Sequence, residues 1–60
     1  MSIDPVVKLD RYYSDRRGIK VHVIGYDRSN GQVHFMRPGY EYLCALPLWY
    51  VEKYFIRLDA

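Results

Sequence analysis

The stretch GIKVHVIGYDRSNGQVHFMRPGYEY, residues 18–42, decides the fold. Apolar β-branched residues alternate with other side chains over residues 19–24, and this period of two predicts a pleated β-strand. Asn30-Gly31 follows, a strong short-range hairpin signal because both residues tolerate positive φ. Alternation then resumes over residues 32–37. The stretch therefore predicts an antiparallel hairpin at the centre of a small, strongly curved sheet.

The length of the hairpin loop decides which side chains share a face. A loop of two or four residues would place the even-numbered residues of 22–26 on the side of Phe35. We prefer a three-residue loop, Ser29-Asn30-Gly31, with a glycine bulge, which sets Phe35 across from Gly25. This loop gathers one apolar face: Ile19, Val21, Val23, Val33 and Phe35. The opposite face is expected to be half covered and holds Lys20, His22, Ile24, Tyr26, His34 and Met36.

One further strand is expected before the hairpin. Residues 6–13 carry apolar side chains in imperfect alternation, which predicts a strand with a bend or bulge near Asp10. The polar residues 14–18 end in glycine and predict a tight turn between this strand and the next. Residues 1–5 have no apolar repeat, so we expect a loose end there.

The part of the chain after the hairpin is predicted to contain a turn, a strand, a helical turn and a final strand. Pro38-Gly39 has the residue order of a type II turn, and Tyr40–Ala45 is predicted to be a further strand after the two of the hairpin. Pro47 can begin a helix because its missing N–H would be unpaired there. Apolar residues spaced by three and four predict one or two turns of α- or 3₁₀-helix over residues 47–53. Alternation over residues 54–58 predicts a short final strand.

The composition predicts a single domain, residues 1–60, that needs support from outside. A domain of 60 residues buries only about 60% of its unfolded surface. One cysteine excludes an internal disulfide, and no zinc-ligand spacing is present. We therefore expect a homodimer or a protein partner. With no apolar run of about 18 residues and no signal-peptide pattern, we expect no membrane contact and a cytoplasmic location.

Four or five short strands and a late helical turn predict a mainly β domain. We expect a small SH3-like antiparallel barrel or a curved sheet of four to five strands. The chain resembles the SH3-like class, which includes Tudor and KOW-type modules. The resemblance rests on the glycine-led strand, the hairpin, the Pro-Gly corner and the final strand after a helical turn.

Three runs carry a second resemblance: DRYYSDRRGIKVHVIGYD (10–27), RPGYEY (37–42) and PLWYVEKYFIRL (47–58). They are similar to a family of short, uncharacterised proteins from phages and prophages of enteric bacteria. The resemblance covers roughly residues 9–58. It implies an accessory protein that binds a host or phage protein, for instance a defence or regulatory factor, or that binds nucleic acid. It implies no catalytic residue.

The aromatic side chains favour protein binding as the function. Seven tyrosines, two phenylalanines and one tryptophan are more than so small a core can hold. Tyrosine and tryptophan are enriched at interfaces because they bury much area with few rotatable bonds. We expect a non-enzymatic module that binds and modulates a protein partner. The expected interface residues, toward a second copy or a target, are Tyr40, Tyr42, Trp49, Tyr50 and Tyr54.

The alternative function is nucleic-acid binding by a small β-barrel. The net charge is +2, and arginines could neutralise phosphates while tyrosines stack on bases. Asp10, Asp15 and Asp27 lie among the arginines and lower the local positive potential. The candidate residues are Arg11, Arg16, Arg17, Lys20, Arg28, Arg37, Tyr12 and Tyr13.

No catalytic or metal site, and no cofactor, is expected. His22 and His34 are predicted to share a face, but two ligands are too few to hold a metal without further support. Cys44 lies between Leu43 and Ala45, a small apolar neighbourhood that is typical of a buried, inert thiol. No nucleophile is paired with a base.

Overall fold

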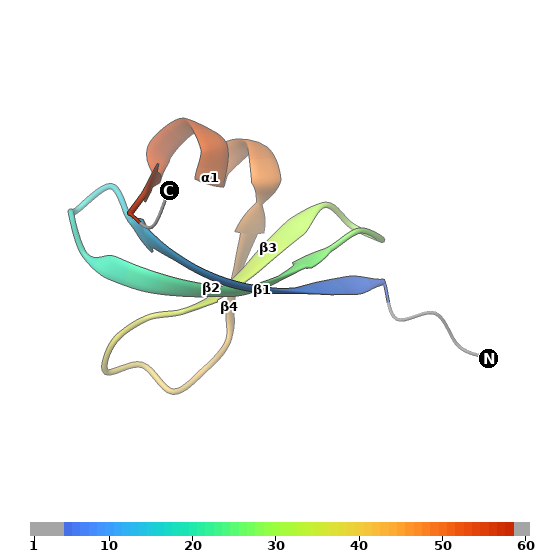
Figure 1. Cartoon of the computed structure of the whole chain (residues 1–60), viewed down its shortest axis with the longest axis horizontal. Coiled ribbons are helices and arrows are strands. Elements are labelled where there is room, and N and C mark those ends of the chain that lie inside the picture. Colours follow the sequence, from blue (N-terminus) through green and yellow to red (C-terminus); the bar gives the residue numbers. More distant parts are fainter. Residues whose placement is uncertain (1–4, 59–60) are drawn as a thin grey trace.

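A curled five-stranded antiparallel sheet and one short helix make up residues 5–58, the part of the chain that the computed structural model describes (Figure 1). The strands lie in the order β4-β3-β2-β1-β5. The sheet forms a half-barrel with α1 on one side, which confirms the mainly β fold, the curved sheet and the late helix. The elements are β1 (Val6–Ser14), β2 (Lys20–Asp27), β3 (Gln32–Met36), β4 (Cys44–Pro47), α1 (Leu48–Tyr54) and β5 (Ile56–Arg57).

Strand β1 pairs with β2 over residues 6–8 and again over residues 11–14. The register shifts between Lys8 and Arg11, which confirms the predicted irregularity near Asp10. The loose end expected over residues 1–5 lies outside the described residues, except for Pro5. The Pro5 carbonyl accepts a hydrogen bond of 3.0 Å from the Arg28 N–H.

The β2–β3 loop has four residues, 28–31, because Asp27 pairs with Gln32. The predicted three-residue loop is therefore wrong. The Asp27 carboxylate accepts hydrogen bonds from the N–H of Ser29 at 2.9 Å and from its hydroxyl at 2.6 Å. The Asp27 carbonyl accepts another from the Gly31 N–H at 2.8 Å. These hydrogen bonds close the turn so that residue 28 belongs to the loop. Aspartate often stabilises the start of a turn by bonding the backbone in this way.

A bulge at Ile24 restores the predicted apolar face. Near the loop Tyr26 pairs with Val33, but beyond the bulge Val23 pairs with Phe35. The extra residue in β2 changes which side chains point inward. Tyr26, predicted on the opposite face, therefore packs against the core.

Gly25 lies opposite His34, so the predicted contact between Phe35 and this glycine is wrong. The structure gives Gly25 another role. A Cβ atom there would lie 3.1 Å from Cγ1 of Val6 and 3.3 Å from the carbonyl oxygen of Val7. Glycine therefore allows β1 to approach β2 closely beside the bulge.

The core lies between the sheet and α1. Ile19 was predicted to belong to it but is 41% exposed, because it lies before β2 in the turn that follows β1. Helix α1 supplies Val51, and Phe55 follows directly after it, with its ring 5.6 Å from the Phe35 ring in an edge-to-face arrangement. The buried apolar residues are Val21, Val23, Val33, Phe35, Val51 and Phe55.

Strand β4 begins later than the strand predicted over Tyr40–Ala45. The Pro38-Gly39 turn is confirmed, with φ of 75° at Gly39. Because Phe35 pairs with Cys44, residues 40–42 lie beyond the end of β3, and residues 40–43 form an exposed loop instead of strand. Pro47 ends β4 and caps α1, so the helix runs one residue later than predicted, and β5 keeps only residues 56–57 of the predicted final strand.

Candidate binding site

The turn between β1 and β2 is organised by a buried carboxylate. Asp15 is only 7% exposed, and one of its oxygens accepts hydrogen bonds from the N–H groups of Arg17, at 2.8 Å, and Ile19, at 2.9 Å. Aspartate often bonds the backbone two residues on in this way. Gly18 completes the turn with φ of 83°, a conformation that suits glycine.

Arg37, at the end of β3, completes the coordination of Asp15. Its guanidinium donates to the second carboxylate oxygen at 3.0 Å, across a separation of 22 residues in the chain. The hydrogen bond from the Ile19 N–H is the largest cause that lowers the pKa of Asp15, and the bonds from Arg17 and Arg37 add to it, against an opposing effect of desolvation. Asp15 is therefore a charged group that fixes both the turn and the Arg37 side chain.

Arg16 reaches from the same turn to helix α1. Its guanidinium lies 4.3 Å from the centroid of the Tyr54 ring and contacts the hydroxyl oxygen of Tyr50 at 3.5 Å. The hydrogen bond to Tyr50 raises the pKa of Arg16 above its ordinary value. Both tyrosines therefore hold this arginine in place by polar and cation–π contacts.

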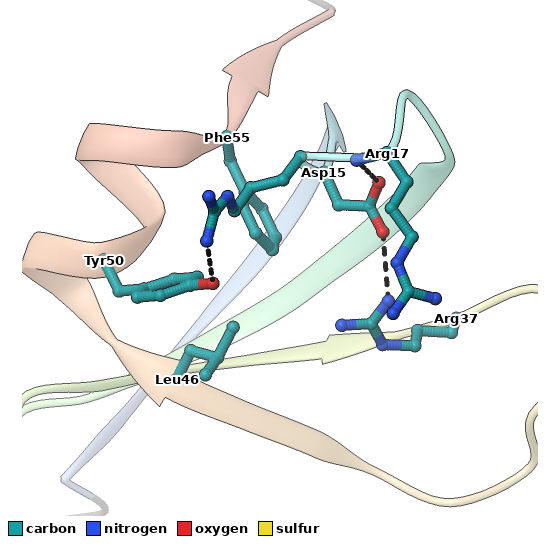
Figure 2. Close-up of a pocket in the computed structure, with 7 residues that line it drawn as sticks. Asp15, Arg17, Arg37, Leu46, Tyr50 and Phe55 are labelled. Carbon is teal, nitrogen blue, oxygen red and sulfur yellow. Dashed lines mark hydrogen bonds and ion pairs between the residues drawn. The ribbon is translucent and has the colours of Figure 1, made fainter.

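These side chains border a pocket of about 680 Å³ (Figure 2). Figure 2 shows the Arg37 guanidinium at the Asp15 carboxylate and the Tyr50 hydroxyl pointing into the space between the turn, the sheet and the helix. Three arginines against one aspartate leave two positive charges without a compensating group in the lining. We call this site the arginine pocket; its lining residues are Asp15, Arg16, Arg17, Arg37, Leu46, Tyr50 and Phe55.

A second, more apolar depression of about 420 Å³ shares Arg17 and Arg37 with the arginine pocket. It is also lined by Ile19, Pro38, Tyr40 and Cys44. Ile19 is 41% exposed and Tyr40 is 52% exposed, so apolar surface adjoins the charged pocket directly. We call the second depression the apolar rim.

A family model matches residues 9–59, nearly the whole chain and every residue that lines the arginine pocket. The chain belongs to the DUF4222 family. The family is described as a domain of unknown function, which fits the resemblance to a family of uncharacterised proteins. Neither the curated proteins nor the solved structures that were searched contain a match.

The DUF4222 fold divides the predicted interface aromatics between two places. Tyr40 and Tyr42 lie in the β3–β4 loop, with ring centroids 5.5 Å apart, and Tyr42 is 63% exposed. Trp49, Tyr50 and Tyr54 belong to α1, on the other side of the sheet (Figure 1). Trp49 is 61% exposed, whereas the two tyrosines of the helix pack against the core. Tyr50 lines the arginine pocket and Tyr40 the apolar rim, so these two lie closest to a common site.

Three of the predicted nucleic-acid residues, Arg16, Arg17 and Arg37, gather in the arginine pocket. The others lie elsewhere. Arg28 is exposed in the β2–β3 turn, and Arg11 borders a groove between β1 and α1.

Three predicted residues are occupied by intramolecular contacts. The Tyr12 ring stacks on His22 with centroids 4.6 Å apart, and the Lys20 ammonium lies 4.5 Å from the Tyr12 centroid. Tyr13 packs against the core. None of these three lines the arginine pocket.

Sequence reasoning missed the central role of Asp15. The aspartate was counted only as a charge that weakens the surrounding arginines. A signal was present, because an aspartate followed three residues later by glycine in a polar turn is typical of a side chain that bonds its own backbone. The pairing with Arg37 carried no local signal, since it depends on the register of three strands.

The remaining chemistry-bearing side chains form no second cluster. Among residues 5–58, no three His, Cys, Asp or Glu side chains are close enough to hold a metal ion. Nε2 of His22 lies 2.6 Å from a carboxylate oxygen of Asp10 on the exposed surface. Within the same residues, no helix is long and apolar enough to cross a bilayer.

Proposed function

We propose that this DUF4222 domain is a non-enzymatic binding module that captures a protein partner at the arginine pocket and the apolar rim. One observation carries the proposal: Arg17 and Arg37 border both depressions, so charged and apolar surfaces meet at two shared side chains. Arginine and tyrosine are the residue types that most often dominate the binding energy of protein interfaces. Three other pockets bordered by residues 5–58 hold at most one arginine each.

The arginines of the pocket are held in different ways. Arg37 is fixed by Asp15, and Arg16 is fixed by Tyr50 and Tyr54. No carboxylate of residues 5–58 forms an ion pair with Arg17. A fixed arginine loses little conformational entropy on binding, and an arginine without an ion pair can accept a new carboxylate in a two-bond arrangement.

These features define the chemistry of the partner. A carboxylate on the partner would meet Arg17 inside the pocket, and an adjacent apolar side chain would cover Ile19 and Tyr40 at the rim. Leu43, which is 53% exposed, lies in the same loop as Tyr40 and extends the apolar surface. The partner is therefore expected to present an acidic residue next to apolar ones.

The finer identity of the module rests on resemblance. An SH3-like small barrel is consistent with five antiparallel strands and a helix between the last two. The three runs quoted above support an origin in phages or prophages of enteric bacteria. We extend the proposal accordingly to an accessory protein that acts in the cytoplasm of the bacterial host, by occupying a site on a defence or regulatory protein.

Nucleic-acid binding is the second candidate, favoured by the three guanidinium groups in one pocket. It is the weaker one, because Tyr12 and Tyr13 are held in stacking and core contacts and cannot offer their rings to bases. It predicts retardation of DNA or RNA at low salt and a steep loss of binding between about 50 and 200 mM salt.

Affinity capture from an enteric bacterial lysate, with and without nuclease, tests the proposal. The bait is compared with two variants that each remove one positive charge, Arg17→Ala in the pocket and Arg28→Ala in the distant β2–β3 turn. We expect a protein that survives nuclease treatment, stays bound to Arg28→Ala and is depleted about tenfold with Arg17→Ala. Equal retention by both variants, or a signal lost on nuclease treatment, would overturn the proposal.

A further inference from the structure

An apolar groove of about 290 Å³ lies between strand β1 and helix α1, away from the arginine pocket. Strand β1 lines it with alternate residues, Val7, Leu9, Arg11 and Tyr13. The other lining residues are Val23, Tyr26, Val33, Leu48, Val51 and Glu52. Val7 is 40% exposed and Leu48 is 37% exposed, so the groove opens to solvent where the half-barrel is not closed.

The groove runs along a strand edge that the sheet leaves uncovered. Strand β5 pairs only with Tyr13 and Ser14 of β1, and the Leu58 N–H extends this contact to the Tyr12 carbonyl. No strand of residues 5–58 pairs with the outer edge of residues 7–11. Such an edge is a template for another strand. The other sheet edge, β4, has four residues and ends in Pro47, which has no N–H to donate.

The main-chain groups of Lys8 and Asp10 point toward this open edge. Alternate residues of an antiparallel strand direct their N–H and C=O groups to the same side. The Tyr12 carbonyl faces outward, toward Leu58, whereas the Pro5 carbonyl faces inward, toward Arg28 of the β2–β3 turn. The register shift between Lys8 and Arg11 lies between these two carbonyls, and on each side of it the even-numbered residues of β1 face outward. Lys8 and Asp10 are also exposed, and the Asp10 side chain remains 83% exposed although one of its carboxylate oxygens contacts Nε2 of His22.

We propose that two copies of the chain pair through their β1 edges, antiparallel and centred on Leu9. In this register Lys8 of each copy forms a hydrogen-bonded pair with Asp10 of the other, and the two-fold axis produces this pair twice. Opposite charges directly across two strands are favourable, whereas like charges there are unfavourable. The sequence Lys8-Leu9-Asp10 is thus complementary to itself when it is reversed, which identifies a second copy as the occupant of the edge.

The same register joins the two apolar grooves. Leu9 of one copy would lie opposite Leu9 of the other, on the face that carries both helices, and Val7 of each would lie opposite the aliphatic part of Arg11. Residues 7–11 of the two copies would join the half-barrels into one sheet, and the pairing would end where Leu58 meets Tyr12. Pairing would cover groove residues that a domain of this size cannot bury alone. It would leave both arginine pockets accessible, because they lie at the far end of β1, beyond Ser14.

Light scattering coupled to size exclusion measures the dimer, and charge swaps test its register. The 7.2 kDa chain is expected to elute as a species of about 14 kDa at micromolar concentrations. Lys8→Glu places two acidic residues opposite each other, and Asp10→Lys places two lysines opposite each other. Each is expected to weaken the dimer about tenfold or more, and the double variant, which restores opposite charges, is expected to recover it.

Lys53→Glu provides the matched control, since it makes the same charge change on the exposed face of α1. It should leave the dimer intact, and circular dichroism verifies that all variants are folded. A wild-type chain that is monomeric at 100 micromolar would overturn the proposal. So would single swaps without effect, or a double variant that fails to recover. Capture of a partner by Lys8→Glu remains as in the wild type, which keeps this test separate from that of the arginine pocket.

Discussion

At the scale of single residues, one buried aspartate connects stability with the proposed function. Asp15 holds the β1–β2 turn through the N–H groups of Arg17 and Ile19, and it fixes Arg37 across the sheet. Removing its charge should therefore loosen both the fold and the site. The structural role and the binding role differ in which atoms they need, because the turn requires an oxygen acceptor and Arg37 requires a negative charge.

We predict that the stability of the domain falls in acid because Asp15 becomes protonated. Its pKa in the folded chain lies below the ordinary value of 3.8, chiefly because of the Ile19 N–H. The unfolded chain therefore takes up the proton more readily. The stabilisation is complete above about pH 5 and is lost as the pH falls below about 4, through the folded pKa. Thermal unfolding at several pH values measures this loss.

Asp15→Asn isolates the charge, since the amide oxygen can still accept the two backbone hydrogen bonds. We expect a lower melting temperature at pH 7, by about 5 °C, and a smaller further decrease between pH 5 and pH 3. Part of the decrease should remain, because Ser29 also lowers the pKa of Asp27. Glu52→Gln, which removes an exposed carboxylate of α1, is the control. An unchanged acid profile in Asp15→Asn would show that this carboxylate does not carry the effect.

At the scale of elements, the sequence predicted what depends on local pattern. The central hairpin, the bulge in β1, the Pro38-Gly39 turn and the helix after Pro47 all follow from period and turn chemistry. The pairing register of the hairpin could not be predicted in this way, because two irregularities cancel. The side chain of Asp27 stabilises a loop that is one residue longer than predicted, which by itself would turn Val23 away from the core. The bulge at Ile24 adds one residue to β2 and returns Val23 to the buried face.

The loop of residues 40–43 shows a second limit. Its alternating aromatic residues match a strand pattern, but they extend beyond the end of β3 and have no strand to pair with. The sequence also could not predict which residues come together in the arginine pocket. Arg16, Arg37 and Tyr50 come from a turn, a strand end and a helix, and only the order of the strands brings them together.

We predict that Gly25→Ala destabilises the domain by about 1 kcal/mol. The added Cβ would lie 3.1 Å from a methyl group of Val6 and 3.3 Å from the carbonyl oxygen of Val7, so β1 must move away from the bulge. Chemical denaturation with urea measures the change. Ser29→Ala in the exposed loop would report only the loss of a surface hydrogen bond. A Gly25→Ala variant as stable as the wild type would contradict the prediction, because β1 would then accommodate the added Cβ without any loss in the free energy of unfolding.

We also predict that helix α1 is held to the sheet mainly by Val51, which is 2% exposed. Val51→Ala removes two carbon atoms from the core and leaves a cavity, at a cost of about 2 kcal/mol in the free energy of unfolding. Leu48→Ala, at a position that is 37% exposed, should cost clearly less. Urea denaturation of both variants gives the comparison, and equal losses would contradict this view of the helix contact.

At the scale of the whole molecule, the half-barrel leaves two kinds of surface incomplete. The arginine pocket holds positive charges without counter-charges beside an exposed apolar loop, and the β1 edge lacks a neighbouring strand. Both fit a domain too small to satisfy all of its own groups. A protein partner at the pocket and a second copy at the edge would satisfy them separately.

Amide chemical-shift mapping tests the location of partner binding most directly. The ¹⁵N-labelled domain is titrated with the protein recovered by affinity capture, and the shifts are assigned to residues. The largest changes are expected in two segments, residues 15–19 of the β1–β2 turn and residues 37–44 around the β3–β4 loop. Changes confined to other segments, such as the β2–β3 turn at residues 28–31, would contradict the assignment of the arginine pocket as the binding site.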